Sequence, residues 1–407
     1  MSITPAILSQ TDDGTPYAPM YDDVYHSRAG AIAQARHVFL AGNDLPARWE
    51  NRISFVIVET GFGLGLNFLT TWATWLELPE SRRCSRLHFV SVEKHPLLKA
   101  DLAKLLATYK TELPPAMITA LITQWPLPTE GFHRLEFEQG RIVLTLILGE
   151  AETVLPQLST QTDAIYLDGF SPAKNPDIWS DRVCQTLARL SGAHTTLATW
   201  CVNGHVRRRL TAAGFDLAFA PGFAQKREML KGRYRERRPH PHPPKTAGHA
   251  LIIGAGLAGT ATAERLSARG WRCTIIEAHA IASGASGNQA GVIRPLPSVD
   301  DNLLSRLIRA GFLSTLRKLQ QLTEMGYPAE WDACGVLHLA RDPEQAVLMQ
   351  RAISHNPSAE HLAAWVAQDQ ASSLAGLALN AGGWWFPSAG WVNPADYCTG
   401  LLKTSGA

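Results

Sequence analysis

An apolar run at residues 55–58 passes directly into a glycine-rich turn, and the residues that follow have a helical pattern. The glycines of this turn are Gly61, Gly63 and Gly65. A buried strand that leads through such a turn into a helix directs backbone N–H groups and the positive end of the helix dipole at a ligand. The pattern therefore predicts a cofactor site at the first glycine turn.

The same order of elements recurs later in the chain. An apolar run at residues 250–253 leads into Gly254, Gly256 and Gly259, which have the spacing of a dinucleotide-binding turn. Glu277 ends the next apolar run, where a carboxylate can accept the hydroxyl groups of a ribose. Two turns of different spacing predict two cofactor sites on one polypeptide, and the spacing alone does not separate FAD from NAD.

Apolar runs and amphipathic segments alternate after the first turn. We expect strands at residues 55–59, 87–93, 142–148, 164–168 and 195–200, and helices near residues 67–77, 96–109, 152–158 and 206–213. This alternation predicts an α/β fold with a parallel sheet and helices on both of its faces. Two short runs at residues 215–220 and 226–231 predict an antiparallel hairpin at one edge of the sheet.

The length of 407 residues favours two domains. Residues 233–248 are rich in arginine, proline and histidine, and this composition predicts an extended linker. We therefore expect one domain at residues 1–232 and a second at residues 249–407. The histidines of the linker alternate with prolines, which permits a metal site, but a solvated spacer is the simpler interpretation.

The formal net charge of +2 requires that any polyanionic partner meet a local basic patch. A candidate patch is the set of cations Arg207, Arg208, Arg209, Lys226, Arg227, Lys231, Arg233, Arg235, Arg237, Arg238 and Lys245. In the same region only Asp216, Glu228 and Glu236 oppose them. Such a stripe can hold phosphates, and the alternative is a solvated helix face followed by a charged linker.

The six cysteines are scattered, which argues against a disulfide framework and against a zinc site, so we expect no metal. A reducing cytoplasm is the compartment that this cysteine usage favours. The first ten residues have no basic region followed by a long apolar run, and no apolar run reaches about 18 residues. We therefore expect neither a signal peptide nor a membrane span.

Three acidic residues are candidates at the first turn. Glu59 precedes the glycines, and Glu93 ends the next apolar run, where it can accept ribose hydroxyls. Glu150 follows the third predicted strand and either lies near an adenine or is an acid at the start of a helix, favoured there by the dipole.

Asp168 closes the fourth predicted strand, and Phe170 and a proline-stiffened loop follow it. Amine-methylating enzymes commonly place an acid or amide, an aromatic ring and prolines here, because the acceptor nitrogen must be oriented in line with the methyl donor. Asp168 can also help to take a proton. The alternative is that Asp168 caps the loop and Phe170 belongs to the core.

Residues 59–69, 168–179 and 222–230 together resemble the MnmC family of bifunctional tRNA-modifying enzymes, and the resemblance extends over nearly all of residues 22–407. It implies a Rossmann-like class I methyltransferase domain whose ligand is S-adenosylmethionine. It also implies that the anticodon loop of a tRNA is the partner, with Phe170 or Trp179 available to stack on a splayed base. The residues that would contact RNA phosphates are Arg207, Arg208, Lys226 and Arg227.

Residues 282–291 resemble the loop that runs beside the flavin in the D-amino-acid oxidase and glycine oxidase superfamily. The resemblance implies FAD rather than NAD at the second turn, with Ser286 and Asn288 beside it. The alternative is a flexible surface loop. Because the chain ends at Ala407, we expect an incomplete FAD-binding Rossmann domain, weak or absent FAD binding and loss of the oxidase step.

In the family that the chain resembles, the FAD module removes the carboxymethyl group from a carboxymethylaminomethyl uridine, and the first module then methylates the amine. We therefore expect a methyltransferase that makes 5-methylaminomethyl-2-thiouridine in tRNA. One alternative is a methyltransferase for a small amine metabolite, and the basic stripe argues against it. Another is a non-catalytic RNA-binding remnant, and the intact Asp168 loop argues against that.

Overall fold

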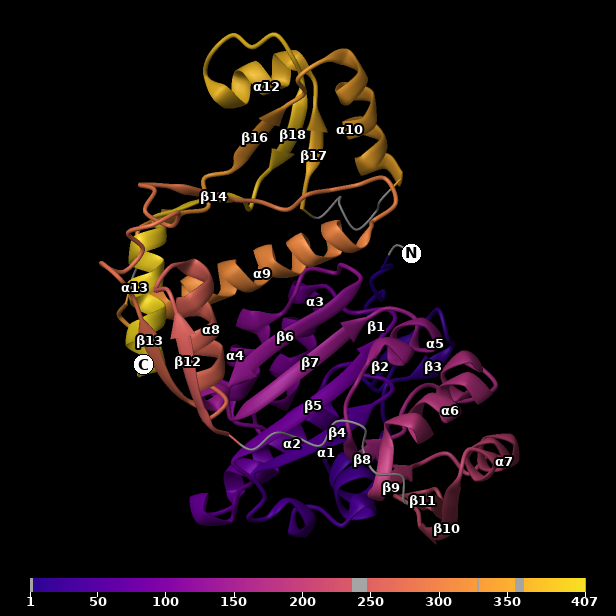
Figure 1. The fold of residues 1–407 in the computed structure, drawn as a ribbon. Helices are drawn as coiled ribbons and strands as arrows, with labels where there is room; N and C mark the ends of the chain where they lie inside the picture. Colours follow the sequence, from indigo (N-terminus) through magenta and orange to yellow (C-terminus); the bar gives the residue numbers. More distant parts are fainter. Residues whose placement is uncertain (1–2, 236–246, 328, 356–361, 407) are drawn as a thin grey trace. The chain divides into compact units, whose positions relative to one another are not determined.

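The computed structural model describes residues 3–235, 247–327, 329–355 and 362–406. The chain divides into two compact units, which we call the N-terminal unit (Ile3–Pro243) and the C-terminal unit (Pro244–Ala407). Each unit has its own sheets and its own apolar core. Figure 1 shows the elements of each unit with the labels used below.

The N-terminal unit is built on an eight-stranded sheet with the order β10-β11-β9-β8-β4-β5-β7-β6. Its five parallel strands are β4 (Ser54–Glu59), β5 (Arg86–Glu93), β7 (Ile142–Leu148), β8 (Thr162–Tyr166) and β9 (Ser191–Thr199). Three antiparallel strands flank them, namely β6 (Gly131–Phe137), β10 (Phe215–Pro221) and β11 (Glu228–Tyr234). The parallel sheet and the antiparallel hairpin at one edge are confirmed.

Helices cover both faces of this sheet. Successive side chains of each strand point to opposite sides, so the strands contribute apolar side chains to a core on each face. On β4, Ile57 belongs to one apolar core and its neighbour Val58 to the other. The first core includes side chains of α2 (Leu66–Glu77), α3 (Lys99–Leu106) and α4 (Pro115–Gln124). The second includes side chains of α5 (Ala151–Val154), α6 (Asp181–Leu190) and α7 (Gly204–Ala212). The two cores confirm the two-layered covering that the sequence predicts.

Several elements differ from the sequence-based expectation. Strand β6 and helices α4 and α6 were not predicted. Strand β11 continues to Tyr234, whose ring is buried against Phe215 at 5.3 Å. The linker predicted from residue 233 therefore begins later, because this aromatic contact holds the strand to the sheet. Its proline- and histidine-rich part, including Arg237, Arg238 and Lys245, lies outside the described residues.

The residues before β4 form small elements of their own. They are β1 (Ser9–Gln10), β2 (Pro16–Ala18), β3 (Asp23–Val24), α1 (Ala31–Gln34) and a π-helical turn, Ala35–Leu40. Short 3-10 helices occur at Ala41–Asn43, Ala47–Trp49, Glu80–Arg82, Ala107–Tyr109, Glu138–Gly140, Leu155–Gln157 and Asp177–Trp179. Val38 and Phe39 of the π-helical turn are buried in the first core, so this segment is part of the domain.

The C-terminal unit opens with β12 (His249–Ile253), α8 (Leu257–Ser267) and β13 (Arg272–Ile276), and its two strands pair in parallel. Two small antiparallel sheets follow, with the orders β14-β19-β15 and β16-β18-β17. Their strands are β14 (Gly291–Ile293), β15 (Trp331–Asp332), β16 (Val336–Leu339), β17 (Ala364–Val366), β18 (Gly383–Phe386) and β19 (Gly390–Val392). The remaining helices are α9 (Leu303–Glu324), α10 (Pro343–His355), α12 (Gln368–Ala375) and α13 (Pro394–Ser405), and α13 packs on α8.

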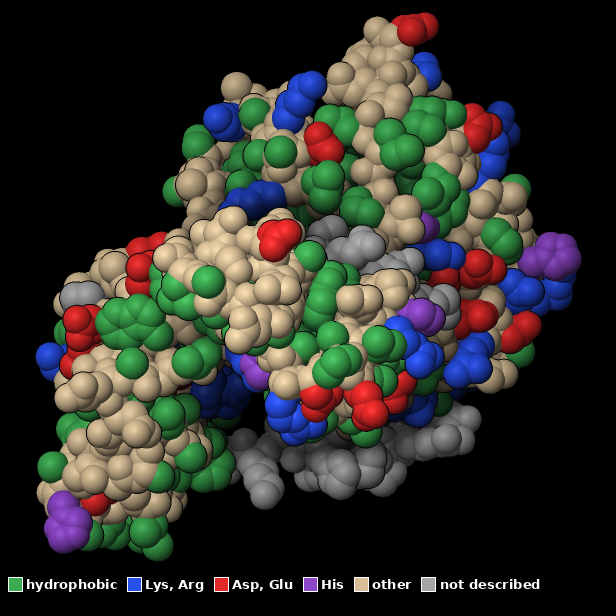
Figure 2. All heavy atoms as spheres, turned by 90° about the horizontal axis from the view of Figure 1, so that it is seen from above, with side chains coloured by type: hydrophobic (Ala, Val, Ile, Leu, Met, Phe, Trp, Pro, Cys, Tyr) green, Lys and Arg blue, Asp and Glu red, His purple; other side chains and the backbone are tan. Residues whose placement is uncertain are grey.

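Among the described residues, no helix is long and apolar enough to cross a membrane. All six cysteines are free thiols, and only Cys334 is exposed. Among the residues drawn in colour in Figure 2, basic and acidic side chains are interspersed.

Candidate functional site

A cavity of about 600 Å³ lies in the N-terminal unit, at the carboxyl ends of β4, β5 and β8. Gly61 follows β4, Glu93 ends β5, and Asp168 lies two residues beyond β8. In a parallel sheet these strand ends share one edge, which is where such folds bind their ligands. The first glycine turn and the Asp168 loop are thereby brought together.

The glycine turn approaches the Asp168 loop closely. A Cβ on Gly61 would lie 3.3 Å from the carbonyl oxygen of Asp168, and both Gly61 and Gly63 line the cavity. Gly65 has a different task. Its φ of +74° is in the left-handed region, and a Cβ there would lie 2.6 Å from the ring of Phe62. Gly65 therefore allows the start of α2 to pack, and it is not among the residues that line the cavity.

Glu93 is held at the rim of the cavity by two backbone donors. Its Oε2 accepts from the N–H of Gly63 at 2.8 Å, and its Oε1 accepts from the N–H of His95 at 2.7 Å. Each carboxylate oxygen has a further lone pair, which is available to a ligand hydroxyl. Glu93 is therefore oriented as a ribose-binding carboxylate would be.

Glu150 lies at the N-cap position of α5 and forms an ion pair with Lys94. It is not among the residues that line the cavity, although Lys94 is. Of the two interpretations that the sequence left open, the structure favours an acid at the start of a helix.

Glu59 is fully buried and does not line the cavity. One of its oxygens accepts from Nδ2 of Asn67 at 2.9 Å, and the other accepts from the hydroxyl of Ser91 at 2.6 Å. Burial raises the pKa of Glu59 well above its usual value. This side chain therefore acts on the cavity through Asn67, and the structure gives it no direct contact with the cavity.

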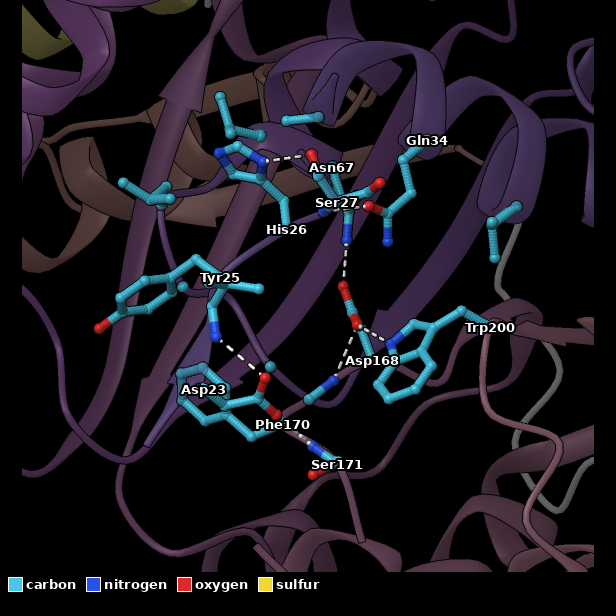
Figure 3. Close-up of a pocket in the computed structure, with 18 of the residues that line it drawn as sticks. Asp23, Tyr25, His26, Ser27, Gln34, Asn67, Asp168, Phe170, Ser171 and Trp200 are labelled. Atoms are coloured by element: carbon cyan, nitrogen blue, oxygen red, sulfur yellow. Dashed lines mark hydrogen bonds between the residues drawn. The ribbon is translucent and has the colours of Figure 1, made fainter. Parts of the chain in front are cut away.

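Asp168 lines the cavity, and three donors fix its carboxylate (Figure 3). Its Oδ1 accepts from the N–H of Gly169 at 2.8 Å and from Nε1 of Trp200 at 3.0 Å. Its Oδ2 accepts from Nδ2 of Asn67 at 2.8 Å. Burial raises the pKa of Asp168, while these hydrogen bonds lower it. The side chain does not simply cap its own loop, because two of its partners are distant in sequence.

Phe170 lines the cavity, and residues from the start of the chain surround its ring. Tyr21 stacks on it with a centroid distance of 4.7 Å, and Tyr25 makes an edge contact at 5.2 Å. The carboxylate of Asp23 accepts from the N–H of Ser171 at 3.0 Å. The N-terminal segment thus forms a wall of the site, which the sequence did not predict. Trp179 is 1% exposed, so its predicted role in stacking on a base is wrong.

Lys226 was predicted to contact RNA, but its side chain lines the cavity. Its Nζ lies 3.3 Å from the centroid of the Trp200 ring, a cation–π contact. Its side chain keeps much accessible surface, yet the partial loss of water around the ammonium lowers its pKa, against the opposing charges of Asp168 and Asp23.

The other predicted RNA contacts lie outside the cavity. Arg207 on α7 stacks over Phe219 at 5.0 Å, and Arg208 bonds to His205. Arg227 is exposed in the hairpin turn.

Acids pair with the other cations of the stripe that the structure describes. Lys231 and Arg233 pair with Asp44, Arg209 pairs with Asp181, and Arg235 pairs with Asp216. The stripe is therefore less basic than its sequence suggests, because the fold brings Asp44 and Asp181 to it.

The second glycine turn lies in the C-terminal unit. Gly254 has a φ of +94°, and a Cβ on Gly259 would lie 1.9 Å from the carbonyl oxygen of Gly254. Glu277 accepts from the N–H of Ala255 at 2.8 Å and from the N–H of His279 at 3.1 Å, and these bonds lower its pKa. The turn has the backbone shape of a dinucleotide site, and side-chain oxygens of Glu277 and Ser286 accept from two of its N–H groups.

The predicted flavin loop lies against this turn. The hydroxyl of Ser286 accepts from the N–H of Leu257 at 3.1 Å, and a Cβ on Gly256 would lie 2.8 Å from the same oxygen. Asn288 bonds to the carbonyl of Ala285 within the loop. Ser286 is therefore beside the glycines, whereas Asn288 shapes its own loop.

No group of three or more potential metal-binding side chains occurs in the part of the chain that the structure describes. Residues 114–235 match the family described as S-adenosyl-L-methionine-dependent methyltransferase. Residues 249–406 match the family described as FAD dependent oxidoreductase. The two matches fall in different units of the structure.

Similar proteins match the chain over nearly all of its length. It is 54% identical to a protein of Aromatoleum aromaticum, covering 99% of this chain and 63% of that protein. It is 51% identical to one of Azoarcus sp., covering 100% of this chain and 64% of that protein. Both are named tRNA 5-methylaminomethyl-2-thiouridine biosynthesis bifunctional protein MnmC.

The chain spans less than two thirds of the length of these relatives. Among solved structures, MnmC2 from Aquifex aeolicus has a TM-score of 0.45 and 22% identity, covering 60% of this chain and 73% of that one. The methyltransferase match precedes the oxidoreductase match along the chain, and the relatives are named as bifunctional proteins. The chain therefore belongs to the MnmC family over the part of those proteins that it spans.

Proposed function

We propose that the N-terminal unit transfers a methyl group from S-adenosylmethionine to the amine of 5-aminomethyl-2-thiouridine in tRNA. The product would be 5-methylaminomethyl-2-thiouridine. The observation that carries the proposal is that the glycine turn at Gly61 and the residue Asp168 line one cavity, with a Cβ on Gly61 only 3.3 Å from the backbone carbonyl oxygen of Asp168. The names of the relatives support the choice of the nucleoside.

The reaction requires a neutral amine nitrogen in line with the methyl carbon and the sulfur of the donor. The nitrogen lone pair forms the new N–C bond while the C–S bond breaks and its electron pair stays on sulfur. The sulfonium becomes a neutral thioether, and the product is a secondary ammonium that releases its proton to water. The protein contributes mainly the position of the two reactants.

In this proposal, Gly61, Gly63 and Glu93 hold the donor. The glycines leave room for it beside the backbone, and Glu93 accepts its ribose hydroxyls. Glu59 supports this side of the cavity from the interior, through Asn67. Glu150 has no part in donor binding beyond its pairing with Lys94.

Asp168 and Phe170 would orient the acceptor. The carboxylate accepts an N–H of the amine, and the exposed part of the Phe170 ring packs on the base or on the incoming methyl group. Because Tyr21 stacks on this ring, the acceptor has fewer positions on Phe170 than the sequence alone suggests.

The C-terminal unit fits FAD in the residues that the structure describes. The turn at Gly254, Gly256 and Gly259 would hold the pyrophosphate, Glu277 would bind the ribose, and Ser286 lies beside the turn. FAD supplies oxidation of a C–N bond, which in the proposed sequence frees the amine that the N-terminal unit methylates. We propose this step for the FAD-dependent module of the family.

Binding of tRNA would rest on cations that have no acidic partner among the described residues. Arg207, Arg208 and Arg227 meet this condition, and they lie on α7 and on the hairpin turn, whose residues 223–226 line the cavity. The free charges favour a tRNA over a small amine metabolite as the acceptor. The cytoplasm, where tRNA is modified, stays the predicted location.

The decisive assay uses labelled S-adenosylmethionine and tRNA from cells that lack the final methyl group, followed by nucleoside analysis. We expect label in 5-methylaminomethyl-2-thiouridine and none in unmodified tRNA. Label in small amines but not in tRNA would favour the metabolite enzyme. Binding of tRNA without any transfer would favour a non-catalytic remnant.

A further inference from the structure

Two side chains from different elements hold the Asp168 carboxylate, and neither has so far been given a role in orienting it. Trp200 directly follows β9, and Asn67 is the second residue of α2. The indole N–H of Trp200 donates to Oδ1, and the amide of Asn67 donates to Oδ2 (Figure 3). Each carboxylate oxygen of Asp168 therefore accepts a hydrogen bond from a side chain of a different element.

The register of the sheet sets the Trp200 contact. Strands β8 and β9 are parallel, with Tyr166 opposite Ala198. Asp168 and Trp200 each lie two residues further along their strands, so they meet at the same edge. The pairing of these central strands therefore brings together the two segments that carry the contact.

The hydrogen bonds leave little freedom to the carboxylate. An ionised carboxyl group has about four acceptor positions. The N–H groups of Gly169, Trp200 and Asn67 use three of them. The remaining position belongs to Oδ2, and Asp168 lines the cavity. A single N–H of an acceptor amine would complete the set.

Trp200 is itself held in place by a charge. Lys226 lies over its ring, with Nζ 3.3 Å from the centroid, and Trp179 packs on it edge to face at 6.1 Å. A cation over an indole ring draws electron density from it, which makes the N–H a stronger donor. Lys226 therefore acts on Asp168 through Trp200 as well as through its own field.

Asn67 connects Asp168 to the donor side of the cavity. Its amide nitrogen donates to Glu59 at 2.9 Å and to Asp168 at 2.8 Å. The two amide hydrogens of Asn67 are thus donated to two carboxylates. One carboxylate is at the end of β4, and the other lies beyond β8. Asn67 separates two like charges that would otherwise repel each other.

We propose that Trp200 and Asn67 are positioning residues, which fix the Asp168 carboxylate so that its last free acceptor position receives the amine to be methylated. This inference rests on the proposed function, because it assigns the acceptor to Asp168. Neither side chain needs to touch the reacting atoms. Both act through the orientation and the ionisation of Asp168.

The test is the pH dependence of single-turnover methyl transfer by the full chain. Asp168 must be ionised to accept the N–H, so the rate falls as the pH falls through its pKa. The charged groups around it are Glu59 on β4 and Lys226 in the hairpin turn, with Asp23 facing Lys226 and Glu93 acting on Glu59. The titration of the substrate amine is common to all variants, so differences between variants report on the protein.

Trp200→Phe keeps a ring under Lys226 and removes only the donor to Asp168. We expect the acid limb to move to higher pH by about one unit, and the rate at neutral pH to fall roughly tenfold. Affinity for S-adenosylhomocysteine, measured by calorimetry, should change less than about threefold, because the donor residues are untouched.

Trp75→Phe is the matched control. Trp75 is fully buried, donates its indole N–H to the carbonyl of Cys84, and has Arg83 over its ring at 4.7 Å. The Trp75→Phe variant also loses one indole N–H hydrogen bond, but Trp75 does not line the cavity. It should lower the melting temperature and leave the acid limb in place. Equal limbs in the two tryptophan variants would overturn the inference.

Asn67→Ala tests the second donor independently and carries the test if Trp200→Phe does not fold. We expect a shift of the acid limb in the same direction, since Asp168 loses a donor and faces Glu59 directly. An unchanged limb would remove Asn67 from the inference. If the unaltered chain transfers no methyl group while it binds tRNA and S-adenosylhomocysteine, the proposed function fails, which is a different result from an active chain whose limb does not respond.

Discussion

The two glycine turns of this chain have nearly the same local chemistry and very different surroundings. In each, a glutamate at or just after the end of the next strand accepts from an N–H of the turn and from the N–H two residues after itself. Glu93 does so with Gly63 and His95, and Glu277 does so with Ala255 and His279. In both units, therefore, the strand, the glycine turn and the next strand are enough to form the same set of hydrogen bonds around a glutamate.

The strands that carry the turns differ. On β4, Ile57 and Val58 are 0% exposed, because strands lie on both sides and helices cover both faces. On β12, Leu251 is 67% exposed and Ile253 is 89% exposed, and the strand pairs only with β13 in the described residues. The first turn also shares a cavity with the candidate acceptor carboxylate Asp168.

The difference teaches that a glycine fingerprint predicts the shape of a turn, whereas the strands and loops around it determine what the turn can bind and do.

The largest expected effect of a substitution is on the acceptor side of the first turn. Asp168→Asn should lower the rate of methyl transfer by about 10²–10⁴-fold, because the amide cannot accept all the N–H groups that surround it. Affinity for S-adenosylhomocysteine should stay within about threefold. A rate that stays within a factor of two would show that the first turn works without its acceptor side.

Substitution of Glu93 and Glu277 tests whether the surroundings of a turn affect ligand binding when the hydrogen bonds of the turn are alike. Glu93→Gln should weaken S-adenosylhomocysteine about 10- to 100-fold in calorimetry, since a half-buried charged acceptor is lost. Glu277→Gln should have a smaller effect in an FAD absorbance titration, because Glu277 is exposed. We also expect the unaltered chain to bind FAD less tightly than S-adenosylhomocysteine. Equal affinities would contradict the comparison.

Arg207 and Arg208 lie on α7, and Arg227 lies on the hairpin turn whose residues 223–226 line the cavity of the first turn. Replacing Arg207, Arg208 and Arg227 by glutamine should weaken tRNA binding roughly tenfold and lower the slope of log affinity against log salt by about two. The matched control replaces Lys231 and Arg235, which are already paired with acids. If the control lowers the slope as much, the paired and free cations do not differ in their contact with RNA.

The smallest expected effect is on the free energy of unfolding, and it comes from the last residue of the strand before a turn. This residue is the buried Glu59 before the first turn and the exposed Ile253 before the second. The folded-state pKa of Glu59 is raised above its usual value of 4.5, so the native state holds more protons than the unfolded state above that pH. Unfolding free energy should therefore fall as the pH rises through the folded pKa.

Glu59→Gln keeps a carbonyl for Asn67 and an amide that Ser91 can accept from, and it removes the buried charge. We expect it to stabilise the protein by on the order of 1 kcal/mol at neutral pH, with no gain below about pH 4.5. Urea denaturation at several pH values measures this difference. A gain that persists unchanged at low pH would mean that the charge is not its origin.

The sequence predicted those parts of the fold that depend on neighbours in the chain. The apolar runs of β4 and β5 and both glycine turns follow local patterns that need no knowledge of distant contacts. Strand β6 was missed because His133 is buried at an inward position, where its polar character hides the alternation.

The site was predicted as far as Gly61, Glu93 and Asp168 line one cavity, and their roles remain predictions. Its other parts depend on contacts between distant residues. The bond from Ser171 to Asp23 spans 148 residues, and the bond from Asn67 to Asp168 spans 101. A basic residue such as Lys226 gives no indication in the sequence that it turns inward to a tryptophan ring.

The contact of Asp23 with the loop after Asp168 has a practical consequence for anyone who trims or tags this chain. Residues 114–235, which carry the methyltransferase match, contain neither the glycine bend nor this aromatic wall. A fragment cut before residue 31 would lose Tyr21, Asp23 and Tyr25 together and leave the acceptor loop without its brace on that side. The opening stretch lines the same cavity as Asp168, although the two are far apart in the sequence.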